Sequence, residues 1–177
     1  MSFTDATYYI LDANIPTSDY NDLTLYIARY EKEVLKKLLG YELWKLVDAY
    51  NATTSPQRIK DIVEGKEYTV DGVLMNWNGL INNDKISLLS YYVLYNFMRE
   101  TSTSLQTTGV TRSIDENANV LGVAQKMVDA WGKMRELYGY YGQDTYAASA
   151  LNFLLNYESD YLEWDFTDIG NVNMFDL

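Results

Sequence analysis

Two pairs of carboxylates are the side chains whose type and spacing could support catalysis or metal binding. Asp160 and Glu163, and then Asp165 and Asp168, lie three residues apart near the C-terminal end. Paired carboxylates can serve as the acid and base of a hydrolase, or hold Mg²⁺ through oxygen ligands. A catalytic pair needs a rigid cleft that separates the two pKa values, and these pairs have no basic or histidine neighbour. A solvated acidic face is therefore the better interpretation.

The absence of histidine and cysteine removes most other catalytic chemistry. Without them the chain has no imidazole base, no thiolate nucleophile and no cysteine-ligated metal site. The glycine motifs that bind phosphate and the Gly-x-Ser-x-Gly elbow are also missing. We therefore expect a protein that is not an enzyme and that uses no cofactor and no metal. An enzyme that works with carboxylates alone stays open as a third hypothesis.

The charge of the chain is unevenly distributed. The net charge is -11, from 14 basic and 25 acidic residues, so the chain has no positive excess to attract free nucleic acid. Arg135 is the last basic residue, and the C-terminal tail (residues 158–177) alternates acids with aromatics. The tail either folds back on its own domain or docks on a partner, because aromatics anchor interfaces and acids match a basic surface. The candidate interface residues are Tyr161, Trp164, Asp165, Phe166, Asp168 and Phe175.

The spacing of apolar residues predicts a mainly helical fold. Apolar residues recur every three or four positions in several segments, and an Asp71-Gly72 turn between two β-rich runs predicts a hairpin. A capping box at Ser113–Glu116 should open the longest later helix, and Gly40 and Gly139 should end helices. The predicted helices are 22–39, 41–50, 56–63, 84–100, 116–138 and 144–157, with a hairpin at 67–77 and a mobile loop at 101–111. The first helix has an apolar stripe of Leu23, Ile27, Tyr30, Val34 and Leu38, and the helix at 84–100 is apolar over more than one face and should be the most buried.

These elements predict one helical bundle of about five to six helices, with a small β-hairpin insertion and extended N- and C-terminal arms. The domain organisation is an N-terminal arm at 1–21, a helical domain at 22–157 and the acidic aromatic tail at 158–177. The first residues lack the pattern of a signal peptide, and no apolar run approaches the length of a membrane span. We therefore expect a protein made in the cytoplasm.

The order of these parts resembles the head-to-tail connector or neck proteins of tailed phages, including ring proteins of the crAss-like group. The resemblance covers roughly residues 23–138 and rests on four features. They are the helix end Leu38-Leu39-Gly40-Tyr41-Glu42-Leu43, the tyrosine-rich helix with Ser90-Tyr91-Tyr92-Val93-Leu94-Tyr95, the polar loop with Gly109, and the helix 116–138. The Asp-Gly hairpin and the acidic tail depart from the pattern.

The resemblance implies a virion protein: copies of the chain form a ring around the DNA exit channel and bind the portal protein on one side and tail or neck proteins on the other. DNA would pass without specific binding, and no catalytic residue is implied. The alternative is a small acidic helical adaptor or inhibitor that binds one basic protein.

Overall fold

The computed structural model describes residues 2–9, 13, 15, 20–101, 103–106, 109–112, 120–139 and 149–165. Within them the chain is mainly helical, with five α-helices, and it includes the predicted antiparallel hairpin, which confirms the fold class. In chain order the elements are η1 (Ala6–Tyr8), α1 (Tyr20–Asp48), α2 (Gln57–Glu64), β1 (Lys66–Val70), β2 (Val73–Trp77), α3 (Leu88–Thr101), β3 (Thr103–Gln106), β4 (Gly109–Arg112), α4 (Val120–Tyr138), α5 (Ala150–Asn156) and η5 (Glu158–Asp160).

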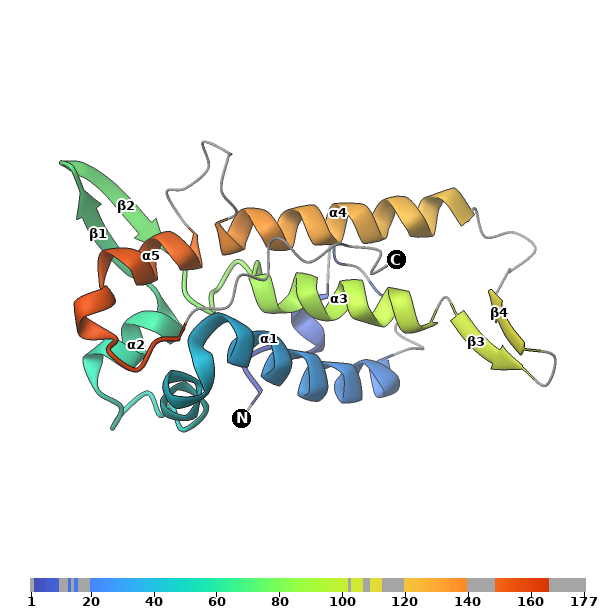
Figure 1. Cartoon of the computed structure of the whole chain (residues 1–177), viewed down its shortest axis with the longest axis horizontal. Helices are drawn as coiled ribbons and strands as arrows, with labels where there is room; N and C mark the ends of the chain where they lie inside the picture. The colour runs from blue at the N-terminus through green and yellow to red at the C-terminus, as the bar shows by residue number, and fades with distance from the viewer. Residues whose placement is uncertain are drawn as a thin grey trace.

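Helix α3 forms the centre of the core. Every residue from Leu88 to Met98 is buried, as expected for a helix that is apolar on more than one face. Figure 1 shows α3 between α1 and α4. The ring of Tyr95 lies 4.9 Å from that of Trp131 on α4, and the ring of Phe97 lies 5.1 Å from that of Tyr26 on α1. The prediction of the most buried helix is confirmed, although it starts at Leu88 rather than at residue 84.

The late start of α3 has a local cause at Asn82. The side-chain oxygen of Asn82 accepts a hydrogen bond from the Ile86 amide at 3.1 Å, and its amide group donates to the Ile86 carbonyl at 2.6 Å. An asparagine that binds the backbone in this way competes with the helical hydrogen bonds. The segment before Leu88 is therefore a turn.

Helix α1 is two helices joined at Gly40. This residue has φ 72° and ψ 168°, a conformation that is essentially restricted to glycine. The first half buries the predicted stripe of Leu23, Ile27, Tyr30, Val34 and Leu38. The predicted end of a helix at Gly40 is therefore confirmed, and the second helix follows without a connecting loop.

Two hairpins lie at opposite ends of the molecule (Figure 1). In the first, β1 and β2 pair antiparallel with Val70 opposite Val73, and both turn residues, Asp71 and Gly72, have positive φ, as the Asp-Gly turn requires. The second hairpin, β3 with β4, occupies the segment that the sequence predicted as a loop at 101–111. That prediction was wrong about secondary structure, because it gave the polarity of the segment more weight than its threonine and valine content, which favours strands.

Several predicted boundaries lie outside the described residues. Helix α4 is described from Val120, so the capping box at 113–116 is outside, and α5 is described from Ala150, so residues 144–148 of the predicted last helix are outside. Helix α4 ends at Tyr138 before Gly139, whose φ is 102°, as predicted. Among the described residues, no helix is both long and apolar enough to span a membrane.

Candidate interaction surfaces

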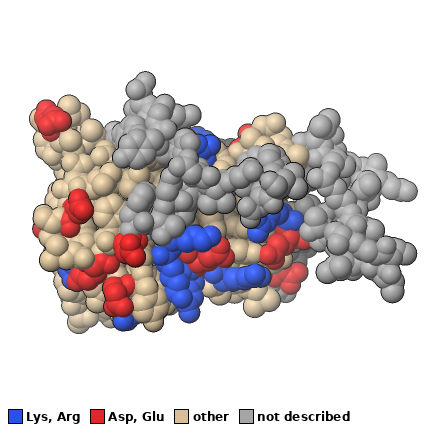
Figure 2. Space-filling view, in the orientation of Figure 1, with Lys and Arg blue, Asp and Glu red and all other residues tan. Residues whose placement is uncertain are grey.

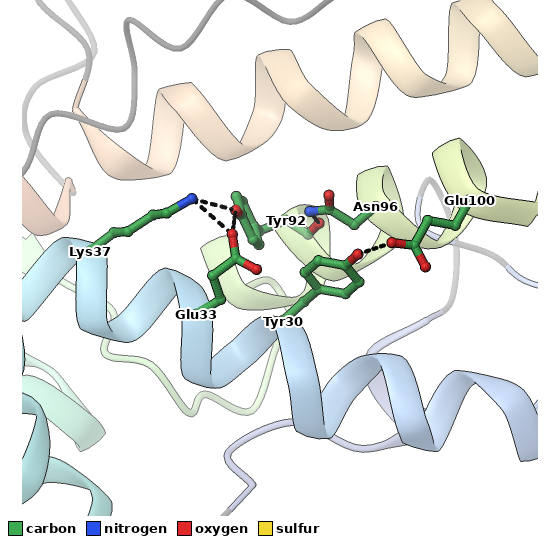
Figure 3. Close-up of polar contacts among 6 residues, drawn as sticks. All are labelled: Tyr30, Glu33, Lys37, Tyr92, Asn96 and Glu100. Carbon is green, nitrogen blue, oxygen red and sulfur yellow. Dashed lines mark hydrogen bonds and ion pairs between the residues drawn. The ribbon is translucent and has the colours of Figure 1, made fainter. Parts of the chain in front are cut away.

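A row of polar side chains from α1 and α3 lies along one side of the contact between the two helices, and we call it the polar seam (Figure 3). Lys37 donates to Glu33 at 2.8 Å and to the Tyr92 hydroxyl at 3.3 Å, while Tyr92 donates to Glu33 at 2.9 Å. Burial acts to raise the pKa of the Glu33 carboxyl, but the hydrogen bonds from Lys37 and Tyr92 outweigh it and leave the pKa below its usual value. The carboxylate is therefore ionised and committed to holding the two helices together.

The same seam continues to the other end of α3. The Tyr30 hydroxyl donates to Glu100, and Arg29 lies 3.7 Å from the same carboxylate. Burial, together with the adjacent Glu100, raises the pKa of Tyr30 to about 12. A phenol with such a pKa stays protonated at neutral pH and is a poor base. Tyr30 therefore serves as a hydrogen-bond donor between the helices.

The first part of the acidic tail lies on its own domain. Tyr161 is only 2% exposed and donates to the Arg58 carbonyl at 2.9 Å, and the Trp164 indole donates to the Leu38 carbonyl at 2.8 Å. Of the two arrangements that the sequence left open for these two aromatics, the structure has the one in which the segment folds back. They lie against α1 and α2 and do not extend as an arm.

An ion pair fixes this segment from the side. The two Arg58 guanidinium nitrogens donate to the two Glu163 oxygens at 2.7 and 2.8 Å, and one of them also donates to the Asp160 carbonyl at 2.9 Å. The hydrogen bonds from Arg58 lower the pKa of Glu163 to about 2. Of the predicted acidic pairs, Asp160 and Glu163 therefore do not act together: Glu163 pairs with Arg58, and the Asp160 side chain is exposed.

The remaining predicted interface residues divide into two groups. Asp165 is exposed, and its backbone passes over Gly40, where its amide nitrogen lies 3.5 Å from the Leu39 carbonyl. Phe166, Asp168 and Phe175 lie outside the described residues. Among the described residues, no group of three or more acidic side chains is placed to hold a metal ion.

Sequence reasoning missed the residue that fastens the N-terminal segment. Glu31 is 3% exposed, and its carboxylate accepts hydrogen bonds from the Ser2 hydroxyl (2.7 Å), the Phe3 amide (3.0 Å), the Thr4 amide (2.7 Å) and the Thr4 hydroxyl. Burial raises the pKa of Glu31 against the opposing effect of these donors. The sequence held one signal, since Glu31 falls beside the apolar stripe of α1.

Sequence reasoning also missed a basic stripe on the outer face of α1. Leu25, Arg29, Lys32 and Lys36 follow one another at spacings of four, three and four, which places them on one helix face opposite the buried stripe. Lys32 and Lys36 hold their ammonium groups 5.3 and 4.4 Å from the centre of the Trp44 ring. We call these four residues the basic stripe.

The opposite charge gathers at another part of the molecule. Figure 2 shows Lys and Arg along α1 with acids among them, and further acids over the end that carries α2 and α5. At that end Leu155, Glu158, Asp160 and Leu162 are exposed, and Leu162 is 86% exposed. We call these four residues the acidic ridge. On a chain of net charge -11, the basic stripe is thus a local row of cations within a helix that has as many acidic as basic residues.

A pocket of about 310 Å³ lies beside the basic stripe, between α1, its second half and the N-terminal segment. Its walls are formed by Ser2, Ala28, Glu31, Lys32, Leu35, Trp44 and Asp48. This volume suits a single side chain or a small ligand at the lower limit of ligand pockets. The lining combines the apolar side chains of Leu35 and Trp44 with the charged residues Lys32, Glu31 and Asp48.

Comparisons with protein-family models, with curated proteins and with solved structures find no match to this chain.

Proposed function

We propose that the chain is a structural subunit of a phage head-to-tail connector, with several copies in a ring that joins the portal to the tail and surrounds the DNA exit channel. The proposal begins with the resemblance carried by the Leu38–Leu43 helix end and the tyrosine-rich α3. It adds that the body is a helical bundle with a hairpin at each end, and that the two ends differ because α2 and α5 lie at the β1–β2 end (Figure 1).

The observation that carries the proposal is this pair of unlike ends. A ring is built from heterologous contacts, in which one surface of a subunit binds a different surface of the next. Strand edges at the two ends offer backbone groups to neighbouring proteins, as in recognition by strand addition. The rigid α1–α3–α4 body, tied by the Lys37–Glu33–Tyr92 seam, suits a mechanical role.

Quantitative mass spectrometry of purified particles from the source phage or prophage tests the proposal. We expect this chain in the particles at the copy number of one ring, far below that of the shell protein. Absence from particles, or a copy number near that of the shell, would contradict a connector role.

The second candidate is a small acidic adaptor or inhibitor of a basic protein, and the exposed Glu158, Asp160 and Leu162 favour it. Pull-down with the full chain, followed by native mass spectrometry, would then give a stable 1:1 complex with a basic protein and no ring. A Glu158→Lys/Asp160→Lys variant should lose that partner.

A further inference from the structure

The two lysines of the basic stripe are available to a partner, whereas Arg29 lies beside Glu100. Leu25 is 71% exposed, the Arg29 side chain is 67% exposed, and no carboxylate among the described residues forms an ion pair with Lys32 or Lys36. The Trp44 ring holds both ammonium groups in place, which lowers the entropy lost when they bind. The stripe therefore presents pre-organised cations next to a pocket.

The acidic ridge has the complementary composition. In sequence order, Glu158 and Asp160 lie between two exposed leucines, Leu155 and Leu162. The ridge is held rigidly from beneath, since Tyr161 is buried and Glu163 is bound by Arg58. Among the large apolar side chains in the described part of the chain, Leu162 is the most exposed.

We propose that the basic stripe of one copy binds the acidic ridge of the next copy. Glu158 and Asp160 pair with Lys32 and Lys36, and Leu162 enters the pocket lined by Lys32, Leu35 and Trp44. Because stripe and ridge are different surfaces, the copy that binds through its stripe keeps its ridge free, and the copy that binds through its ridge keeps its stripe free. The contact can therefore repeat and close into a ring. This inference rests on the proposed function and identifies the contact between subunits.

Charge explains why the partner is a second copy and not nucleic acid. The stripe contains three cations on a chain of net charge -11, which is far from the basic excess that binding to a phosphate backbone requires. The acidic ridge is present at the same concentration as the stripe and matches it in charge and in apolar anchors. Opposite charges also set the register of such contacts.

Charge reversal with complementation tests the contact. The stripe variant is Lys32→Glu/Lys36→Glu, and the ridge variant is Glu158→Lys/Asp160→Lys, each studied as the full chain by sedimentation velocity and native mass spectrometry. We expect wild type to assemble and each variant alone to stay monomeric, with a dissociation constant raised about tenfold or more. Mixing the two variants should restore assembly, because every contact then joins opposite charges.

Control variants separate this contact from general effects of charge and folding. Glu67→Lys/Asp84→Lys changes the net charge by the same amount as the ridge variant at exposed acids outside the ridge and should assemble like wild type. Circular dichroism melts should show that all variants fold. Leu162→Ala should weaken assembly without lowering the melting temperature, because the side chain is exposed in the monomer.

Three results would overturn the inference. They are a wild type that stays monomeric up to about 100 μM, assembly unaffected by either reversal, and a mixture that fails to assemble. Loss of duplex DNA binding by the stripe variant with assembly unchanged would make the stripe a nucleic-acid surface instead. The proposed function has a separate test. If the two charge-reversed variants assemble together but the chain is absent from purified particles, the contact between copies stands and the connector role is contradicted.

Discussion

At the scale of single residues, two charged side chains, Glu31 and Arg58, each bind a segment that is distant in sequence. Glu31 holds residues 2–4, and Arg58 holds the segment that contains Glu163. Neither contact could be predicted from the sequence, because the partners lie 27 to 29 and 105 residues apart and follow no local spacing rule. The exposed acids of the tail could be predicted, but the arginine that neutralises one of them could not.

The Arg58–Glu163 pair should make the stability of the chain depend on pH. The folded pKa of Glu163, about 2, lies below its ordinary value of 4.5, so its stabilising contribution is present above pH 4.5 and is lost as the pH falls towards 2. We expect Glu163→Gln to lower the free energy of unfolding by about 0.5–1 kcal/mol at pH 7, since the pair is partly exposed. The difference from wild type should shrink at pH 3 in urea titrations.

The control for this prediction is the Arg58→Ala background. There Glu163→Gln should cost little at either pH, because the partner is already missing. A pH-dependent difference that survives in Arg58→Ala would show that another group lowers the pKa of Glu163.

Glu31→Gln should loosen the N-terminal segment. The glutamine amide would face donors at Phe3 and Thr4 that now bind carboxylate oxygens, so we expect a loss of about 2–3 kcal/mol in unfolding free energy. Hydrogen exchange at the Phe3 and Thr4 amides should speed up before global unfolding.

The control for this prediction is Glu42→Gln. Glu42 forms an exposed ion pair with Lys45, so its substitution should leave stability nearly unchanged. Equal effects of the two substitutions would contradict a fastening role for Glu31.

At the scale of elements, the joint in α1 is a tightly constrained position. A Cβ added at Gly40 would lie 2.8 Å from Asp165 Cβ and 2.9 Å from its backbone nitrogen, and φ there is 72°. Gly40→Ala should therefore lower the free energy of unfolding by about 2 kcal/mol or more through backbone strain and displacement of residues 164–165. Urea titration followed by tryptophan fluorescence would measure it.

Gly132 is the matched control for Gly40. It lies inside α4, and an added Cβ would meet nothing within 4 Å. Gly132→Ala should raise stability by about 0.5–1 kcal/mol, because alanine loses less entropy in a helix. A loss of stability at both positions would show that the Gly40 effect does not come from the joint.

Two truncations should separate the contribution of residues 159–165, which the structure describes, from that of residues 166–177. Deleting residues 159–177 exposes the sites of Tyr161 and Trp164, so we expect a clear fall in melting temperature, about 2–4 kcal/mol in free energy. A chain that stops after Asp165 keeps these contacts and the acidic ridge, so its melting temperature should lie clearly above that of the chain lacking residues 159–177. If this shorter chain fails to assemble, the predicted interface residues Phe166, Asp168 and Phe175 belong to the contact.

At the scale of the whole molecule, the sequence predicted what depends on local periodicity. The buried α3, the break at Gly40 and the hairpin at Asp71-Gly72 each depend on a few neighbouring residues, and the structure has all three. It did not predict what depends on distant contacts: the docking of Tyr161 and Trp164, or the division of charge between α1 and the far end. Polar composition also hid the second hairpin, because strands need cross-strand partners that a single segment does not reveal.

The contact between Trp164 and Leu38 joins residues 126 positions apart, and it covers the joint of α1 with a segment that is translated much later. During synthesis, α1 leaves the ribosome long before residues 161–165, which lie over its joint, so this part of the fold can form only after they have been translated. A chain terminated before residue 158 would lack both this cover and the acidic ridge. Such a chain could not use its ridge in the assembly that we propose.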